Sequence, residues 1–140
     1  MIPNYQQFMR PFLDVAKAAN GNEVKLRDVI NELADKFNLT EDEREETLPS
    51  GNQRVIDNRV GWARTYLSKA GLLEVTRRAH FIITERGITA LKDKQAVIDN
   101  KYLKQFDEFI AFKDQKNAIT NNGVEDSDDI DDITPDEALR

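Results

Sequence analysis

A set of amide, guanidinium, hydroxyl and ammonium side chains recurs at helical spacing in the middle of the chain. Its members are Gln53, Arg54, Asn58, Thr65 and Lys69. Amide and guanidinium groups match the donors and acceptors of DNA base edges and phosphates, and a good bidentate base contact contributes about 1–3 kcal/mol of discrimination. The set therefore indicates a DNA-binding helix face, with a solvated face that binds nothing as the alternative.

Apolar residues at spacings of three and four predict the helix that positions this face. They are Ile56, Val60, Ala63, Leu67 and Ala70, which form one buried stripe and leave the polar set exposed on the other side. Ser50 and Gln53 form a capping box, so we expect the helix to begin at Gly51. Gly71 stands where a left-handed residue commonly ends a helix.

Trp62 lies beside the polar set, and the sequence leaves two interpretations open for it. The indole is either a half-buried wedge between helices or a platform at the DNA surface.

A hairpin with a basic tip is expected directly after this helix. Two short runs rich in apolar or β-branched residues, 72–75 and 81–84, flank a tip that carries Arg77, Arg78 and His80. A short helix pair, a polar-faced helix and a basic hairpin follow one another in the order of a winged helix-turn-helix. In that fold the third helix enters a DNA groove while the hairpin contacts the neighbouring backbone.

The flanking segments complete a mainly α prediction. We expect a helix over 3–19 that is kinked at Pro11, a short strand at 23–26, and a helix over 26–37. Thr40 and Glu43 form a capping box before an acidic turn, and Thr84 caps a helix that ends near Lys92. A last helix over 95–113 has an aromatic face that either packs on the domain or forms a homodimer.

The net charge of −6 is unevenly distributed along the chain. Residues 1–46 carry −4, residues 47–92 carry +5, and residues 93–140 carry −7. Exposed charges act within about 8–10 Å in physiological salt, so a distant acidic tail does not exclude DNA binding by the basic segment. Eight acids and no base between Glu125 and Glu137 predict a flexible acidic linker.

The sequence offers no disulfide framework, signal peptide or apolar stretch of roughly 20 residues, so we expect a cytoplasmic protein without membrane contact. It also offers no credible catalytic or metal site. Glu23 and Lys25 form an ExK triplet with Asp14 upstream, but such triplets are common by chance and the strand is too short for a nuclease core. His80 is the sole histidine of a chain without cysteine, which excludes a His/Cys zinc site.

Several longer motifs together resemble the N-terminal domain of Mrr-type restriction endonucleases. They are LPSG at 48–51, NRVGWA at 58–63, YLSKAGLL at 66–73, ITERG at 83–87, YLKQFDEF at 102–109 and, more weakly, TPDEAL at 134–139. The resemblance implies a DNA-binding module joined to a C-terminal PD-(D/E)xK nuclease that cuts modified, typically methylated, DNA. Relatives tend to carry glycine after the paired arginines of the wing, where this chain has Ala79.

We therefore predict a winged-helix DNA-binding domain over 1–94, a helical extension over 95–116 and an acidic linker over 117–140 that leads to a nuclease domain outside this chain. The predicted DNA ligands are Gln53, Arg54, Asn58, Trp62, Thr65, Lys69, Arg77, Arg78 and His80. No catalytic residue, cofactor or metal is expected in this fragment. The alternatives are a protein-interaction or dimerisation module and a free-standing transcriptional regulator.

Overall fold

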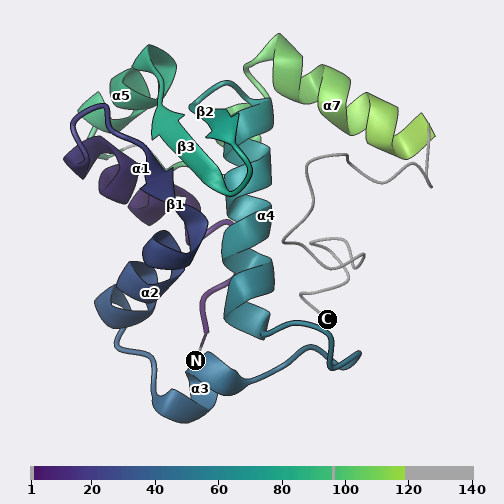
Figure 1. Ribbon diagram of the computed structural model, residues 1–140. Helices are drawn as coiled ribbons and strands as arrows, with labels where there is room; N and C mark the ends of the chain where they lie inside the picture. The colour runs from purple at the N-terminus through teal and green to yellow at the C-terminus, as the bar shows by residue number, and fades with distance from the viewer. Residues whose placement is uncertain (1, 96, 119–140) are drawn as a thin grey trace.

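The computed structural model describes residues 2–95 and 97–118 (Figure 1). The elements in chain order are α1 (Met9–Ala18), β1 (Val24–Lys25), α2 (Leu26–Lys36), α3 (Glu41–Glu45), α4 (Val55–Lys69), β2 (Leu73–Arg77), β3 (His80–Ile83), α5 (Glu85–Lys92), α6 (Asn100–Leu103) and α7 (Asp107–Ala118). The described part of the chain is therefore mainly helical with a small sheet, as predicted. Most of the proposed acidic linker lies outside the described residues.

The sheet has the antiparallel strand order β1-β3-β2. Strands β2 and β3 form the predicted hairpin, and Val24 and Lys25 of β1 pair with Phe81 and His80 on its other edge. The register shifts between Val75 and Arg77, which leaves Thr76 as an extra residue on β2. The turn places its backbone beside the start of α2, because the amide of Leu26 donates to the carbonyl of Ala79 at 2.9 Å.

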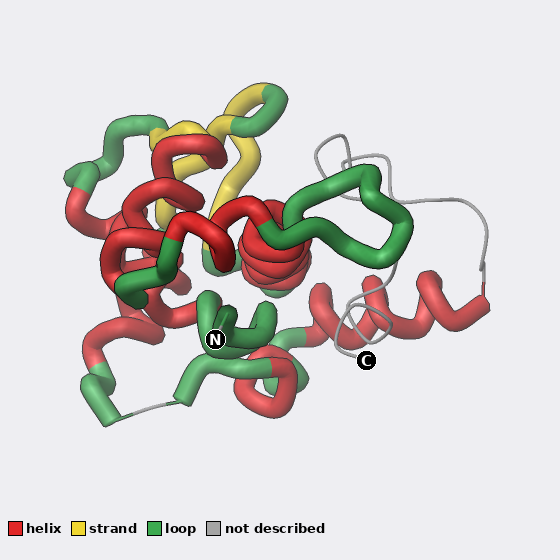
Figure 2. The backbone as a smooth tube through the Cα atoms, turned by 90° about the horizontal axis from the view of Figure 1, so that it is seen from below, coloured by secondary structure: helices red, strands yellow, loops and turns green. Residues whose placement is uncertain are grey.

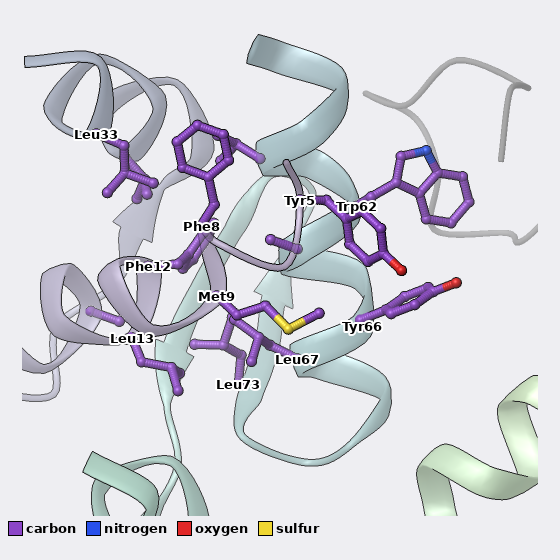
Figure 3. Packing of buried hydrophobic residues seen from close by; sticks show 14 of the residues in the cluster. Tyr5, Phe8, Met9, Phe12, Leu13, Leu33, Trp62, Tyr66, Leu67 and Leu73 are labelled. Atoms are coloured by element: carbon purple, nitrogen blue, oxygen red, sulfur yellow. The ribbon is translucent and has the colours of Figure 1, made fainter. Parts of the chain in front are cut away.

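Helix α4 runs through the middle of the molecule, and Figure 2 shows it nearly end-on among the other elements. Helices α1 and α2 pack against one side of α4, and α7 lies against its C-terminal half. Figure 3 shows how Phe8, Phe12 and Leu33 meet residues of α4 such as Leu67 in one apolar cluster. Burial of each such side chain stabilises the folded state by about 1.5–3 kcal/mol. Because these side chains meet at α4, the core is organised around this helix.

The predicted start of α4 is wrong, because the helix begins at Val55 and not at Gly51. Gly51 has a φ of +76°, which a helix does not accommodate. The hydroxyl of Ser50 instead accepts from the amide of Asn52 in a local turn. Residues 47–54 form a narrow loop closed by a bridge between Thr47 and Arg54.

The first helix is also shorter than predicted. α1 begins at Met9, which places Pro11 in its first turn. The missing amide proton of a proline costs no helical hydrogen bond there, so no kink is required.

Three other predicted capping positions are confirmed. Thr40 and Glu43 form the reciprocal capping box of α3, and the Thr84 hydroxyl accepts from the amide of Gly87 at the start of α5. Gly71 follows α4 with a φ of +85°. Short side-chain acceptors and glycine fix these ends locally, so they could be predicted without knowledge of the tertiary fold.

The aromatic segment after α5 packs on α4 of the same chain. The predicted helix over 95–113 is interrupted, with α6 and α7 separated by a turn. Phe109 is fully buried, and its ring lies edge-on against Tyr66 with the centroids 5.4 Å apart. The aromatic face therefore packs on the domain of its own chain, which is one of the two arrangements expected for it.

A tight joint connects the end of α4 to α5 and α7. The Thr84 hydroxyl donates to the Gly71 carbonyl at 2.7 Å, and the Arg86 guanidinium donates to the Ala70 carbonyl at 2.8 Å. Arg86 also pairs with Glu108 and stacks on Phe106, 4.6 Å from the ring centroid. These contacts give structural roles to residues of two sequence motifs, AGLL at 70–73 and TERG at 84–87.

Gly87 is required where the first turn of α5 passes the Leu72 carbonyl and Ile83 of β3. A Cβ atom at this position would lie 2.4 Å from the Leu72 carbonyl oxygen and 2.7 Å from Cγ1 of Ile83. Gly87→Ala is expected to lower the free energy of unfolding by about 1–3 kcal/mol, measured by denaturant titration. The control Thr89→Ala, exposed on the same helix, should stay within about 0.5 kcal/mol of wild type. Equal stability of the two variants would contradict the proposed crowding.

Ala79 has a φ of +62°, in the region that favours glycine. A left-handed conformation costs an L-residue about 1–2 kcal/mol. Replacement by glycine removes this cost, but the greater conformational entropy of glycine in the unfolded chain cancels part of the gain. Ala79→Gly is therefore expected to stabilise the domain by about 0.5–1 kcal/mol in thermal unfolding. Ala18→Gly, an exposed position in the last turn of α1, should destabilise by a similar amount; destabilisation by both changes would refute the strained turn.

Candidate nucleic-acid interface

The polar face of α4 is buried, so the prediction that it is exposed is wrong. Asn58, Trp62 and Thr65 are each at most 4% exposed. The helix carries buried residues on every side, including Val55, Trp62 and Tyr66 outside the predicted stripe. A helix surrounded by the domain cannot place these side chains in a DNA groove in this conformation.

The Thr65 hydroxyl and the Asn58 side-chain nitrogen, both buried on α4, donate hydrogen bonds within the chain. The Thr65 hydroxyl donates to the carbonyl of Gly61 at 3.1 Å, one turn earlier. The Asn58 amide donates to Oε1 of Gln53 at 3.2 Å, and Gln53 itself is half-buried in the loop before the helix. These contacts give the three residues structural roles.

Trp62 is buried rather than half-buried, and the Tyr66 ring beside it belongs to the same helix. Its ring lies edge-on against Tyr66, with the centroids 6.0 Å apart (Figure 3). Because the side chain is 4% exposed, it is not a surface platform in this structure.

Lys69 and Arg54 lie at opposite ends of α4 and are both half-buried. The Lys69 ammonium lies over the Phe112 ring, 5.6 Å from its centroid, beside α7. Arg54 precedes the first residue of the helix, and its Nη2 lies 2.9 Å from Oδ1 of Asp57. Its Nη1 donates to the Arg44 carbonyl at 3.2 Å. Arg54 therefore lies at the rim of the buried helix rather than along its length.

The hairpin carries the predicted basic residues at its exposed end. Arg77 and Arg78 are exposed, and His80 is half-buried with Nδ1 2.7 Å from the carbonyl oxygen of Arg78. Nη2 of Arg77 lies 3.2 Å from Oε1 of Glu23. The hairpin therefore presents guanidinium groups from its turn, one of them paired with a carboxylate.

Two basic residues next to this hairpin did not enter the predicted set. Lys25 pairs with His80 across β1 and β3, and Arg27 lies in the first turn of α2. Both are exposed. The only sequence signal for them is the alternation of Lys25 and Arg27 around the buried Leu26, which becomes informative once β1 is known to join the hairpin.

The described residues hold no group of three or more histidine, cysteine, aspartate or glutamate side chains that could bind a metal ion. Of the ExK triplet and its upstream aspartate, Glu23 pairs with Arg77 of the hairpin and Asp14 lies 3.9 Å from the Lys36 ammonium on α2. None of the helices in the described ranges has the length and apolarity needed to cross a bilayer.

Comparison with known proteins identifies the family. The model of the Mrr N-terminal domain matches residues 5–93. The chain belongs to this family. A curated relative, the type IV methyl-directed restriction enzyme EcoKMrr of Escherichia coli (strain K12), is 34% identical over 86 residues, which cover 61% of this chain and 28% of the relative. No solved structure matches the chain significantly.

The family match covers most of the described fold. The chain spans little more than a quarter of the curated relative, and the matched family region includes α1 to α5 with the buried α4 and the basic hairpin.

Glu23 gives the hairpin a pH-dependent contact. Its pKa lies below the ordinary value of 4.5 because the Thr76 hydroxyl and then the Arg77 guanidinium stabilise the carboxylate. A lowered pKa in the folded state adds stability above the unfolded pKa, and this is lost as the pH falls through the folded pKa. The difference in melting temperature between wild type and Glu23→Gln is therefore expected to shrink below pH 4.5.

Glu74→Gln, which removes an equal charge from β2 of the same hairpin, corrects for the change in net charge. A wild-type advantage over Glu23→Gln that stays constant from neutral pH into the acid range would show that the carboxylate contributes no pH-dependent stability.

Proposed function

We propose that this domain binds double-stranded DNA and is the targeting part of a restriction endonuclease that recognises modified DNA. The observation that carries the proposal is the exposed pair Arg77 and Arg78 on a hairpin of the Mrr N-terminal domain family. The curated relative is a methyl-directed restriction enzyme, which supports the link to modified DNA.

The order of the elements supports a winged helix-turn-helix. α1, β1, α2, α4, β2 and β3 follow one another in the winged-helix order, with β1 added to the hairpin edge and α3 inserted before α4. In such folds the wing grips the DNA backbone. Cleavage would then belong to a PD-(D/E)xK domain of the longer enzyme, which acts in the cytoplasm.

The wing, the β2–β3 hairpin, is expected to position the domain on the duplex rather than to distinguish base sequences. Guanidinium groups that contact phosphates fix the register of a protein on a duplex without distinguishing bases, and the buried Asn58 and Thr65 are withdrawn from base contact. The phosphate contacts of the wing should therefore contribute equally to the binding of methylated and unmethylated duplexes.

The double variant Arg77→Ala/Arg78→Ala tests the proposal in the 140-residue chain. The logarithm of the binding constant should fall with the logarithm of the salt concentration less steeply by about 1.8, because each phosphate contact contributes about 0.9 to that slope. Fluorescence anisotropy of a labelled duplex across a salt series measures the slope.

Lys94→Ala/Lys101→Ala is the matched control, since both lysines are exposed and lie after the hairpin in the chain. It should keep the wild-type slope. If the wild-type chain binds no duplex at low salt, or if both double variants behave alike, the wing is not a DNA contact.

A further inference from the structure

Two arginines from different helices share one carboxylate near the start of α4. Nη1 and Nη2 of Arg27 donate to Oδ1 and Oδ2 of Asp57, both at 3.1 Å. From the other side, Nη2 and Nε of Arg54 donate to Oδ1 and Oδ2 at 2.9 and 3.3 Å. The Asp57 side chain is 13% exposed, so this carboxylate is held inside the pair of guanidinium groups.

The cluster keeps one positive charge and fixes the orientation of both guanidinium planes. Bidentate pairing to a carboxylate defines the plane of an arginine much more closely than a single contact does. The cluster therefore has the net positive charge to bind a further oxyanion, and the Arg27 side chain is 49% exposed.

The cluster is continuous with the wing through short backbone links. The Leu26 amide donates to the Ala79 carbonyl in the hairpin turn, and Lys25 pairs with His80 across the sheet. Arg27 follows Leu26 directly. We call the series Arg78, Lys25, Arg27 and Arg54 the basic strip.

Acidic residues limit the basic strip at its far end. Helix α3, which packs against α4, carries Glu41, Asp42 and Glu45 as exposed side chains. A polyanion that follows the basic strip from the wing would meet repulsion beyond Arg54, so the strip has a defined length.

We infer that Arg27 and Arg54 together bind one backbone phosphate of duplex DNA and extend the contact made by the wing. The ligand class is a phosphodiester, and the cluster adds a second anchor point on the DNA in which Arg27, absent from the predicted set, joins the predicted ligand Arg54. This inference rests on the proposed DNA-binding function.

Arg27→Ala in the 140-residue chain tests the site against the matched control Lys36→Ala. Lys36 lies at the other end of α2, its side chain is 50% exposed, and it also pairs with a carboxylate. Arg27→Ala should bind a labelled duplex about eightfold more weakly at about 0.1 M salt and lower the salt slope by about 0.9. Lys36→Ala should leave both quantities unchanged.

Arg54→Ala is the second variant, and circular dichroism confirms folding of each. It should reproduce the loss of slope, and the double variant should lose little more than either single change because both arginines serve one phosphate. Inorganic phosphate at constant ionic strength should not displace the duplex from wild type, since an isolated ion lacks the neighbouring contacts.

Equal behaviour of Arg27→Ala and Lys36→Ala would overturn the site. If the wing variant still weakened binding in that case, the proposed function would stand without this anchor. A wild-type chain that binds no duplex would instead remove the proposed function itself, and displacement by inorganic phosphate would assign the cluster to a small anion.

Discussion

Enclosure of α4 is the constraint on which the rest of the structure depends. A helix with buried residues on all sides needs neighbours around its whole circumference, and α1, α2, α3, β2 and α7 supply them. The enclosing elements therefore determine which side chains reach solvent. Arg54, at the beginning of α4, remains near the surface, whereas Asn58 and Thr65 along its length do not.

The same enclosure concentrates positive charge at the periphery. The hairpin turn, β1 and the first turn of α2 meet through the Leu26 amide and the Ala79 carbonyl, which brings Arg78, Lys25 and Arg27 into sequence along one edge. Two carboxylates pair with arginines along this edge and leave it with a net positive charge. Glu23 pairs with Arg77, and Asp57 is shared by Arg27 and Arg54. DNA affinity in such an arrangement comes from phosphate contacts and depends on salt.

Local chemistry made part of the fold predictable. The capping residues Thr40 and Thr84 and the left-handed Gly71 act within a few residues of their own positions, so their roles follow from the sequence alone. The hairpin was predictable for the same reason. Its conformation at Ala79 also explains why a glycine suits that position, since φ is +62° there.

The candidate site was less predictable because it depends on long-range packing. Periodicity assigned Asn58 and Thr65 to solvent, since polar residues usually occupy the exposed face of a helix, but tertiary contacts enclosed them. The pairing of Arg27 with Asp57 joins residues 30 positions apart, and no spacing rule links them. Gly51 adopts a positive φ that is incompatible with a helix, so residues 47–54 form a loop and α4 begins only at Val55.

Trp62 is the sole tryptophan of the chain and reports directly on the enclosure of α4. The decisive measurement is acrylamide quenching of its fluorescence, with and without a saturating DNA duplex. We predict weak quenching and a blue-shifted emission that the duplex leaves unchanged, because the indole lies inside the protein while DNA binds at the periphery. Strong quenching of the free protein that DNA suppresses would show that the helix face itself is open and meets the duplex, which contradicts the account.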